Sequence, residues 1–204
     1  RELRGRGVKV VDLSADFRLR DLATYEQWYV EHPAPELIGE AVYGLTELYR
    51  EQIAGASLVA NPGCFPTAAL LTLAPLARAG LIADVVVDAK TGVSGAGRAA
   101  TQTTHFVSIA ENVVPYRVGG HRHTPEIDQE LALLGAHVRT TFVPHLVPLD
   151  QGELTSCYVT PTRPIAQDEL DALYAQAYAG EPFIEVASVP PGVRSSFTAR
   201  ISAG

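Results

Sequence analysis

Methionine is absent from this sequence, and cysteine and tryptophan are scarce: the 204 residues include two cysteines and one tryptophan. Two cysteines cannot form the dense disulfide framework of small secreted domains, so the composition fits a reducing, cytoplasmic environment. Because even the first residue is not methionine, we expect the chain to be a piece of a longer protein.

Long hydrophobic runs and clusters of positive charge are also missing. The longest apolar stretch, residues 68–77, contains Thr72 and Pro75 and is too short to cross a bilayer. No charged-then-apolar segment of the kind that directs secretion opens the sequence. The net charge of −7, with no basic cluster to offset it, argues against nucleic acid or an anionic membrane as a partner.

What is present is typical of a globular protein. Hydrophobic residues make up 47% of the chain and charged residues 19%, and the length suffices for one large domain or parts of two. The residue pattern predicts strands at 7–13, 57–60, 84–90, 138–147, 153–161 and, as the last one, 183–189. The pair 138–147 and 153–161 is expected to form a hairpin around 149–152. Apolar periodicity and end signals predict helices at 22–29, 67–78, 124–134 and 166–178.

Cys64 stands where the 57–60 strand turns into a helix. The turn Asn61-Pro62-Gly63 precedes it, and Pro66 suits the first helical turn, where its missing N–H costs nothing. Backbone N–H groups and the positive end of the helix dipole stabilise an anion there, so a thiol in this place has a lowered pKa and can act as a nucleophile. Cys64 can equally be a small buried apolar residue, as most reduced cysteines are.

A candidate anion-binding residue follows the 7–13 strand. At the carboxyl end of a buried parallel strand, where open α/β sheets bind ligands, the sequence continues Ser14-Ala15-Asp16-Phe17-Arg18. Arg18, together with Arg20, could bind an anion through paired hydrogen bonds. A solvated pair of surface arginines is the alternative.

A glycine-rich loop follows the 84–90 strand. Gly92, Gly95 and Gly97, with Ser94, let the backbone approach a ligand closely and turn its N–H groups towards an anion. The spacing is Gly-x-x-Gly-x-Gly, so the Gly-x-Gly-x-x-Gly fingerprint of dinucleotide-binding turns is absent. Such a loop can also be no more than a mobile turn.

Two histidines lie just before the helix that Thr124-Pro125-Glu126 opens. Either His121 or His123 could present an imidazole to a thiol or a carbonyl oxygen, and histidine is the usual acid/base near neutral pH. Glu126 could orient whichever histidine acts. No third ligand has convincing spacing for a metal site, and two exposed loop histidines are the remaining alternative.

These stretches resemble one known family. Asn61-Pro62-Gly63-Cys64-Phe65-Pro66-Thr67-Ala68 resembles the active-site signature of the N-acetyl-gamma-glutamyl-phosphate reductases, acyl-phosphate reductases of the aspartate-semialdehyde dehydrogenase superfamily. The segments 11–19, 91–98 and 121–127 are similar to further motifs of that family, with Thr91 in place of its serine. The resemblance runs from about residue 7 to about residue 189, and the segment 195–200 does not share it.

The resemblance implies an activity and a set of site residues. The activity is the NADPH-dependent reduction of N-acetyl-glutamyl 5-phosphate to the 5-semialdehyde in arginine biosynthesis, by way of a thioester on Cys64. The implied acid/base is His121 or His123. The implied substrate-binding residues are Arg18, Asn61 and Glu126, and the implied cofactor-binding residues are Gly92, Ser94, Gly95 and Gly97.

The implied fold is the tail of an NAD(P)-binding Rossmann domain at 1–62, followed at 63–204 by an α+β catalytic and dimerisation domain with a mixed sheet. The second domain is expected to be incomplete at its C-terminus, and the protein to be a homo-oligomer. A reductase of the related aminoadipyl phosphate in lysine biosynthesis is one alternative, although Phe65-Pro66 argues against it. The others are a Cys/His acyl transferase or hydrolase that needs no nicotinamide, and a non-catalytic folding or dimerisation module.

Overall fold

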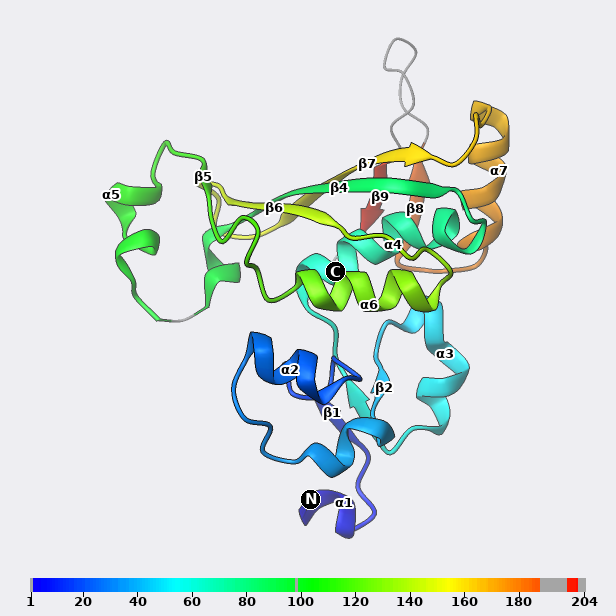
Figure 1. The fold of residues 1–204 in the computed structure, drawn as a ribbon. Helices are drawn as coiled ribbons and strands as arrows, with labels where there is room; N and C mark the ends of the chain where they lie inside the picture. Colours follow the sequence, from blue (N-terminus) through cyan, green and yellow to red (C-terminus); the bar gives the residue numbers. More distant parts are fainter. Residues whose placement is uncertain (1, 98, 188–197, 202–204) are drawn as a thin grey trace. The chain divides into compact units, whose positions relative to one another are not determined.

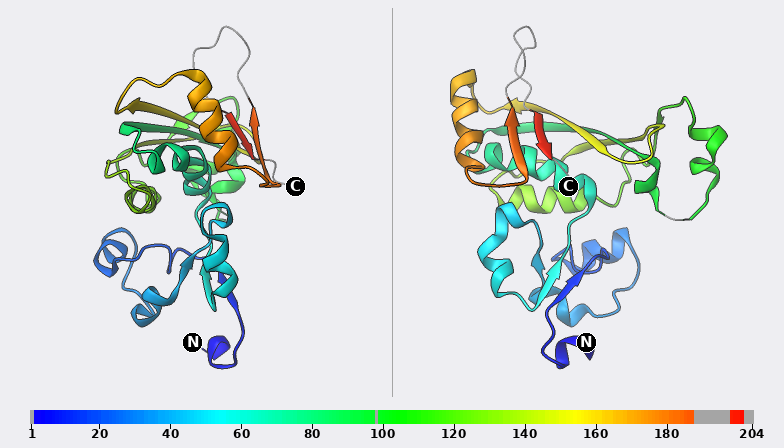
Figure 2. Two further views of the ribbon diagram at one scale, coloured as in Figure 1. Left: turned by 90° about the vertical axis from the view of Figure 1, so that its right-hand side faces the viewer. Right: turned by 180° about the vertical axis from the view of Figure 1, so that it is seen from behind.

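The computed structural model describes residues 2–97, 99–187 and 198–201 (Figure 1). The chain divides into two compact units, residues 1–67 and 68–204, and each is described by itself. Their elements can be followed from two further sides in Figure 2.

The first unit is built on a three-stranded parallel sheet of order β1-β3-β2. Its strands are β1 (Val10–Asp12), β2 (Val42–Tyr43) and β3 (Leu58–Ala60), and its helices are α1 (Glu2–Gly5), α2 (Leu22–Trp28), the 3-10 helix η1 (Pro35–Glu40) and α3 (Thr46–Gly55). The expected strands at 7–13 and 57–60 are confirmed in shorter form, and so is the helix at 22–29. The first strand is parallel as expected, but it is not buried, because Val11 at its centre is 61% exposed. Asp21 caps α2 by accepting a hydrogen bond from the backbone N–H of Thr24 at 2.8 Å, which satisfies one of the helix's unpaired donors.

The second unit contains a four-stranded mixed sheet of order β5-β6-β4-β7. Its strands are β4 (Ile82–Thr91), β5 (Val114–Pro115), β6 (Thr141–Leu146) and β7 (Glu153–Pro161). The helices that accompany it are α4 (Cys64–Arg78), η2 (Val93–Ala96), η3 (Gln102–Thr104), α5 (Phe106–Ile109), α6 (Thr124–Leu133) and α7 (Gln167–Ala177). The predicted ends of two helices are confirmed, because Gly80 and Gly135 follow α4 and α6 with φ of +67° and +104°, a conformation that glycine adopts without strain.

One face of the mixed sheet is buried and the other is more open. Along β4 the residues Val85, Val87 and Ala89 are fully buried, and α4 and α6 lie on one side of the sheet (Figure 1). The side chains that alternate with them are only half-buried, and on β7 Leu154 and Tyr158 are 58% and 61% exposed. Alternation of this kind is what a sheet shows when a single face is covered.

The expected hairpin between 138–147 and 153–161 is wrong. Both strands exist, but β4 lies between them, parallel to β6 and antiparallel to β7, while the other edge of β6 pairs with β5. A strand–helix–strand connection through α6 brings β6 back parallel beside β4, and the ten residues of β4 then offer β7 a partner of its own length. Residues 149–152 separate β6 from β7, as predicted, but the two strands do not pair across them.

The strand expected as the last one has a partner that the sequence pattern did not reveal. β8 (Ile184–Ala187) pairs antiparallel with β9 (Thr198–Ile201). Residues 188 and 189 of the expected strand lie outside the described residues.

A proline inside α4 is compensated by Tyr178, the residue that follows α7. Pro75 lacks the N–H that would bond the carbonyl of Leu71 one turn earlier, and the Tyr178 hydroxyl donates to that carbonyl instead. The neighbouring hydroxyl, that of Tyr174, donates to the carbonyl of Thr72. The helix that begins at Cys64 therefore keeps a buried carbonyl satisfied through a side chain from another element.

We expect Tyr178→Phe to lower the free energy of unfolding by about 1–3 kcal/mol, because it leaves the Leu71 carbonyl buried without a donor. In a Pro75→Ala background the loss should be much smaller, since the restored backbone N–H can bond the same carbonyl. Tyr174→Phe is the matched control and should cost the same in both backgrounds. Urea unfolding of the variants makes the comparison, and an equal cost of Tyr178→Phe in both backgrounds would contradict the compensation.

Candidate active site

Cys64 is the first residue of α4, so its place at a helix N-terminus is as the strand–turn–helix pattern predicted. The residue is exposed, and the alternative of a small buried cysteine is therefore wrong. β3 ends at Ala60, and the first helical bond runs from the Thr67 N–H to the Gly63 carbonyl at 3.0 Å. The sulfur therefore lies in the first turn of a helix, where backbone N–H groups and the helix dipole favour a thiolate. Cys157 differs, because burial within β7 raises the pKa of its thiol to about 12.

The first unit brings Arg18 and Asn61 together. The Arg18 side chain donates from Nε to the Asn61 carbonyl at 2.7 Å and from Nη2 to the Leu13 carbonyl at 3.1 Å. The Asn61 N–H in turn donates to the Asp12 carbonyl at the end of β1, at 2.8 Å. The guanidinium thus braces the turn that leads into Cys64, a contact across 43 residues that the sequence did not indicate.

In the second unit, His121 is buried and His123 is the N-cap residue that precedes α6. His121 is 8% exposed and its ring lies edge-on to those of Tyr116, His123 and Phe142, at centroid distances of 5.5, 4.8 and 5.2 Å. Its Nδ1 accepts the backbone N–H of His123 at 3.1 Å, so the ring proton of neutral His121 resides on Nε2. Two exposed loop histidines are therefore not what the fold contains.

Burial and charge keep His121 neutral. Burial is the main reason that its pKa falls to about 4, and the positive charges of Arg117 and Arg122 lower it further. His123 is half-buried at the N-cap position of α6, and Glu126, three residues on, is 1% exposed. The two histidines are thus neighbours with different environments.

The glycine-rich loop lies against the β6–β7 connection. The N–H groups of Gly92, Val93 and Ser94 donate to the carbonyls of Gly152, Leu149 and Asp150 at 2.9, 2.9 and 3.1 Å. A Cβ on Gly92 would come within 2.7 Å of the Asp150 carbonyl oxygen, so the close backbone approach at this glycine is to the protein itself. These three N–H groups are consequently not turned towards an anion, contrary to our expectation.

The same loop is more open near its last glycine. Gly97 has φ of +94°, and a Cβ there would meet no atom within 4 Å. Open space beside the loop backbone is therefore found at Gly97, whereas a Cβ on Gly95 would come within 2.7 Å of the Thr91 hydroxyl oxygen and Gly92 packs against the protein itself.

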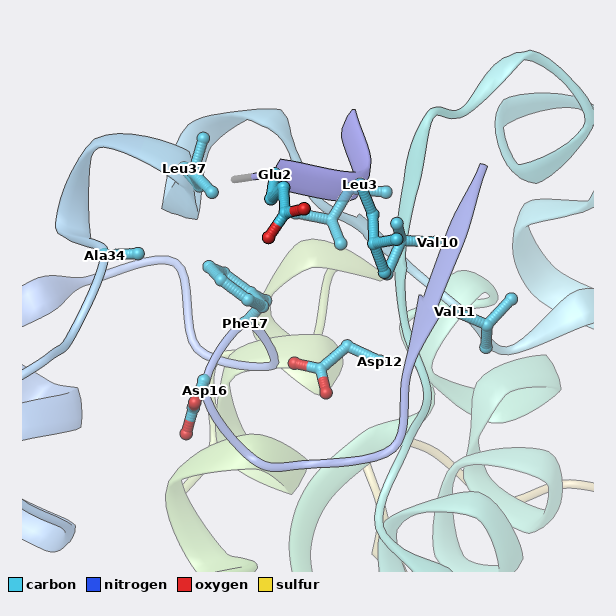
Figure 3. A pocket seen from close by; sticks show the side chains of 10 residues that line it. Glu2, Leu3, Val10, Val11, Asp12, Asp16, Phe17, Ala34 and Leu37 are labelled. Carbon is cyan, nitrogen blue, oxygen red and sulfur yellow. The ribbon is translucent and has the colours of Figure 1, made fainter. Parts of the chain in front are cut away.

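The first unit also has a cavity of about 410 Å³ beside β1 (Figure 3). Its lining includes the carboxylates of Glu2, Asp12 and Asp16 together with the ring of Phe17, which makes it unsuited to an anionic ligand. Among the described residues no three His, Cys, Asp or Glu side chains are grouped as a metal site. No helix in the described ranges is both long and apolar enough to cross a membrane.

A parallel sheet of nucleotide-binding type, followed by an α+β unit with a mixed sheet, defines a two-domain dehydrogenase-like protein. The chain belongs to the semialdehyde dehydrogenase family: residues 64–200 match the family model described as semialdehyde dehydrogenase, dimerisation domain, and residues 1–56 match semialdehyde dehydrogenase, NAD binding domain. The fold class expected from the sequence is confirmed.

Curated relatives carry one name. The chain is 53% identical over 193 residues to the N-acetyl-gamma-glutamyl-phosphate reductase of Moorella thermoacetica, covering 93% of this chain and 55% of that protein. It is 53% identical over 197 residues to the protein of the same name from Desulforudis audaxviator, covering 95% and 56%. The chain thus spans about half the length of the curated relatives it matches.

Solved structures show the same fold at lower identity. Aspartate semialdehyde dehydrogenase II from Vibrio cholerae superposes with a TM-score of 0.62 at 20% identity, covering 85% of this chain and 54% of that one. Aspartate semialdehyde dehydrogenase from Francisella tularensis gives 0.60 at 15% identity, covering 86% and 58%.

Proposed function

We propose that this protein reduces N-acetyl-glutamyl 5-phosphate to N-acetyl-glutamate 5-semialdehyde with NADPH, a step of arginine biosynthesis. The observation that supports this most strongly is 53% identity, over 93% of the chain, to a protein named for that reaction. An exposed cysteine at the first turn of α4 supplies the nucleophile that the reaction needs.

In the proposed mechanism the Cys64 thiolate attacks the acyl carbon of the substrate. A carbon–sulfur bond forms, the bond to the phosphate oxygen breaks, and inorganic phosphate leaves a thioester on Cys64. Backbone N–H groups at the start of α4 stabilise the oxyanion. NADPH, when bound, supplies the hydride that converts the thioester into the aldehyde.

The remaining site residues are assigned around that chemistry. His123 handles the proton, because a histidine whose pKa burial lowers to about 4, as for His121, is neutral at physiological pH and a poor proton donor. His121 donates a hydrogen bond from Nε2, and Glu126 orients the pair. Arg18 and Asn61 bind the substrate, and the loop of Gly92, Ser94, Gly95 and Gly97 holds the nicotinamide end of the cofactor. The functional boundary lies at 62/63, between a cofactor-binding part and a catalytic part.

The test is phosphate- or arsenate-dependent reduction of NADP⁺ by N-acetyl-glutamate 5-semialdehyde, using the purified protein at its natural length. Activity that requires both the semialdehyde and the oxyanion is expected. A thiol-dependent hydrolase or transferase would release acid or acyl product without reducing NADP⁺, and a lysine-pathway enzyme would prefer the aminoadipate semialdehyde. NAD⁺ in place of NADP⁺ measures the cofactor preference.

We also propose a cytoplasmic homo-oligomer that acts on a small molecule. A catalytic thiol must stay reduced, which the cytoplasm ensures. The more open face of the mixed sheet, with Leu154 and Tyr158 exposed on β7, belongs to the segment that matches the dimerisation-domain model. Light scattering should give a multiple of the protomer mass, and Tyr158→Glu should shift it towards the monomer.

Arg18→Lys is expected to lower kcat/KM for the acyl phosphate by roughly ten- to a hundredfold, because an ammonium cannot reproduce a fork of parallel hydrogen bonds to a phosphate. In the reverse reaction the KM for phosphate should rise, while the KM for the semialdehyde, which carries no phosphate, should barely change. Steady-state kinetics in both directions measures this. A variant that loses affinity for the semialdehyde but keeps its phosphate KM would assign Arg18 another role.

A further inference from the structure

A buried histidine lies next to the loop that carries Arg18. His32 follows α2 and is only 5% exposed, although a polar side chain in a turn is usually solvated. Its ring lies edge-on to the ring of Tyr25, with centroids 4.6 Å apart, and to that of Phe17 at 5.3 Å. The imidazole is therefore fixed in place by aromatic neighbours on two sides.

Two hydrogen bonds define the direction of this imidazole. The backbone N–H of Ala34 donates to His32 Nδ1 at 3.0 Å, so Nδ1 is an acceptor and the ring proton belongs on Nε2. Nε2 lies 2.6 Å from the carbonyl oxygen of Asp16 and donates to it. The carboxylate of Asp16 accepts a second bond, from the Tyr25 hydroxyl at 2.9 Å. Asp16 is thus held through its main chain and its side chain at once.

Asp16 precedes Arg18 by two residues, so the same contacts fix the base of the arginine. The Arg18 N–H bonds the Ala15 carbonyl at 3.3 Å, and its Nε reaches the Asn61 carbonyl at 2.7 Å. Because a guanidinium is a rigid planar fork, the direction of its donors follows from where its backbone is held and which acceptor Nε meets.

We propose that His32 is a positioning residue for Arg18: by holding the Asp16 carbonyl it fixes the loop from which the guanidinium reaches the turn before Cys64. The proposal rests on the proposed function for its kinetic consequence, namely that a loosened Arg18 binds the phosphate of the substrate less well. Its structural consequence, that the bond from Arg18 Nε to the Asn61 carbonyl weakens, is independent of any activity.

Two substitutions separate the two hydrogen bonds of His32. In His32→Asn the side-chain oxygen can still accept the N–H of Ala34, as asparagine does in turns two residues on, but nothing reaches the Asp16 carbonyl. In His32→Gln the amide nitrogen can reach the Asp16 carbonyl, and the bond from Ala34 is lost. If His32 only stabilises the 32–34 turn, His32→Gln should be the more damaging substitution for the phosphate KM. If His32 positions Arg18, His32→Asn should be the more damaging one.

The kinetic experiment compares both variants with wild type in the phosphate-dependent oxidation of N-acetyl-glutamate 5-semialdehyde. His32→Asn should raise the KM for phosphate about tenfold, because one buried hydrogen bond is lost. The kcat at saturating phosphate should change less than about threefold. His32→Gln should keep the phosphate KM within about threefold of wild type. Equal phosphate KM values in the two variants, or the larger rise in His32→Gln, would overturn the proposal.

Hydrogen exchange at Arg18 Nε, followed by NMR, tests the proposal even if the protein lacks that activity. The signal should be protected in wild type and in His32→Gln, and should exchange about tenfold faster in His32→Asn. Unchanged exchange in His32→Asn would reject the positioning role. An inert wild type with the expected exchange pattern would instead reject the proposed function alone.

Discussion

Cys64→Ser is expected to lower kcat by on the order of 10⁴-fold or more, the scale of loss when a covalent nucleophile is removed. A serine hydroxyl is a far weaker nucleophile than a thiolate near neutral pH. The place of residue 64 in the first turn of α4 favours the thiolate but does not ionise a hydroxyl. Phosphate-dependent NADP⁺ reduction measures the loss, and substrate binding should persist because the substitution changes one atom.

Cys157 is the matched control for Cys64. Cys157→Ser should leave turnover within about threefold of wild type, because the residue lies in β7 with a thiol whose pKa burial raises to about 12. Iodoacetamide should accordingly alkylate Cys64 well before Cys157. The activity should fall in proportion to the fraction of Cys64 that is alkylated. Turnover that survives complete alkylation of Cys64 would rule out a thioester on this residue.

His123→Asn is expected to lower kcat by roughly 10²–10⁴-fold with a modest change in KM, as the removal of a general acid/base does. We assign the role to His123 and not to His121 because burial and two nearby arginines lower the pKa of His121 to about 4. A neutral His121 imidazole offers an Nε2–H donor at physiological pH. The pH dependence of kcat should lose its near-neutral limb in His123→Asn.

The neighbouring histidine supplies the comparison. His121→Asn should affect mainly the KM for the semialdehyde and leave the near-neutral limb of the pH profile in place. Should the two single replacements exchange these effects, the acid/base would be His121. Should both leave turnover within a few-fold of wild type, neither histidine would handle the proton.

The Cys64 turn shows how much local signals determine. Asn61-Pro62-Gly63 ends a strand, Pro66 allows a first helical turn, and Gly80 stops the helix; each effect acts within a few residues, through steric limits on φ or a missing N–H. The observed α4 begins at Cys64 and ends at Arg78. The place of Cys64 at a helix N-terminus was therefore predictable before any fold was known, whereas the exposure of its thiol was not.

Pairing across the mixed sheet was not predictable in this way. The 149–152 turn looks like a hairpin turn locally, yet β7 pairs with β4 and not with β6. Strand choice depends on which long partner is already in place and on which face must be buried. β9 was missed for the same reason: residues 198–201 pair with β8, and their local pattern did not indicate that pairing.

The sequence by itself determined most of the longer strands and helices, the place of Cys64 at a helix start and the kinship to a reductase family, because these depend on contiguous residues. Only the tertiary structure decided that His121 is buried and that the Tyr178 hydroxyl bonds the Leu71 carbonyl, 107 residues away. It also decided that His32 bonds the Asp16 carbonyl and Arg18 the Asn61 carbonyl. Burial and long-range hydrogen bonds arise only when distant segments pack together, and no local pattern encodes which groups then meet.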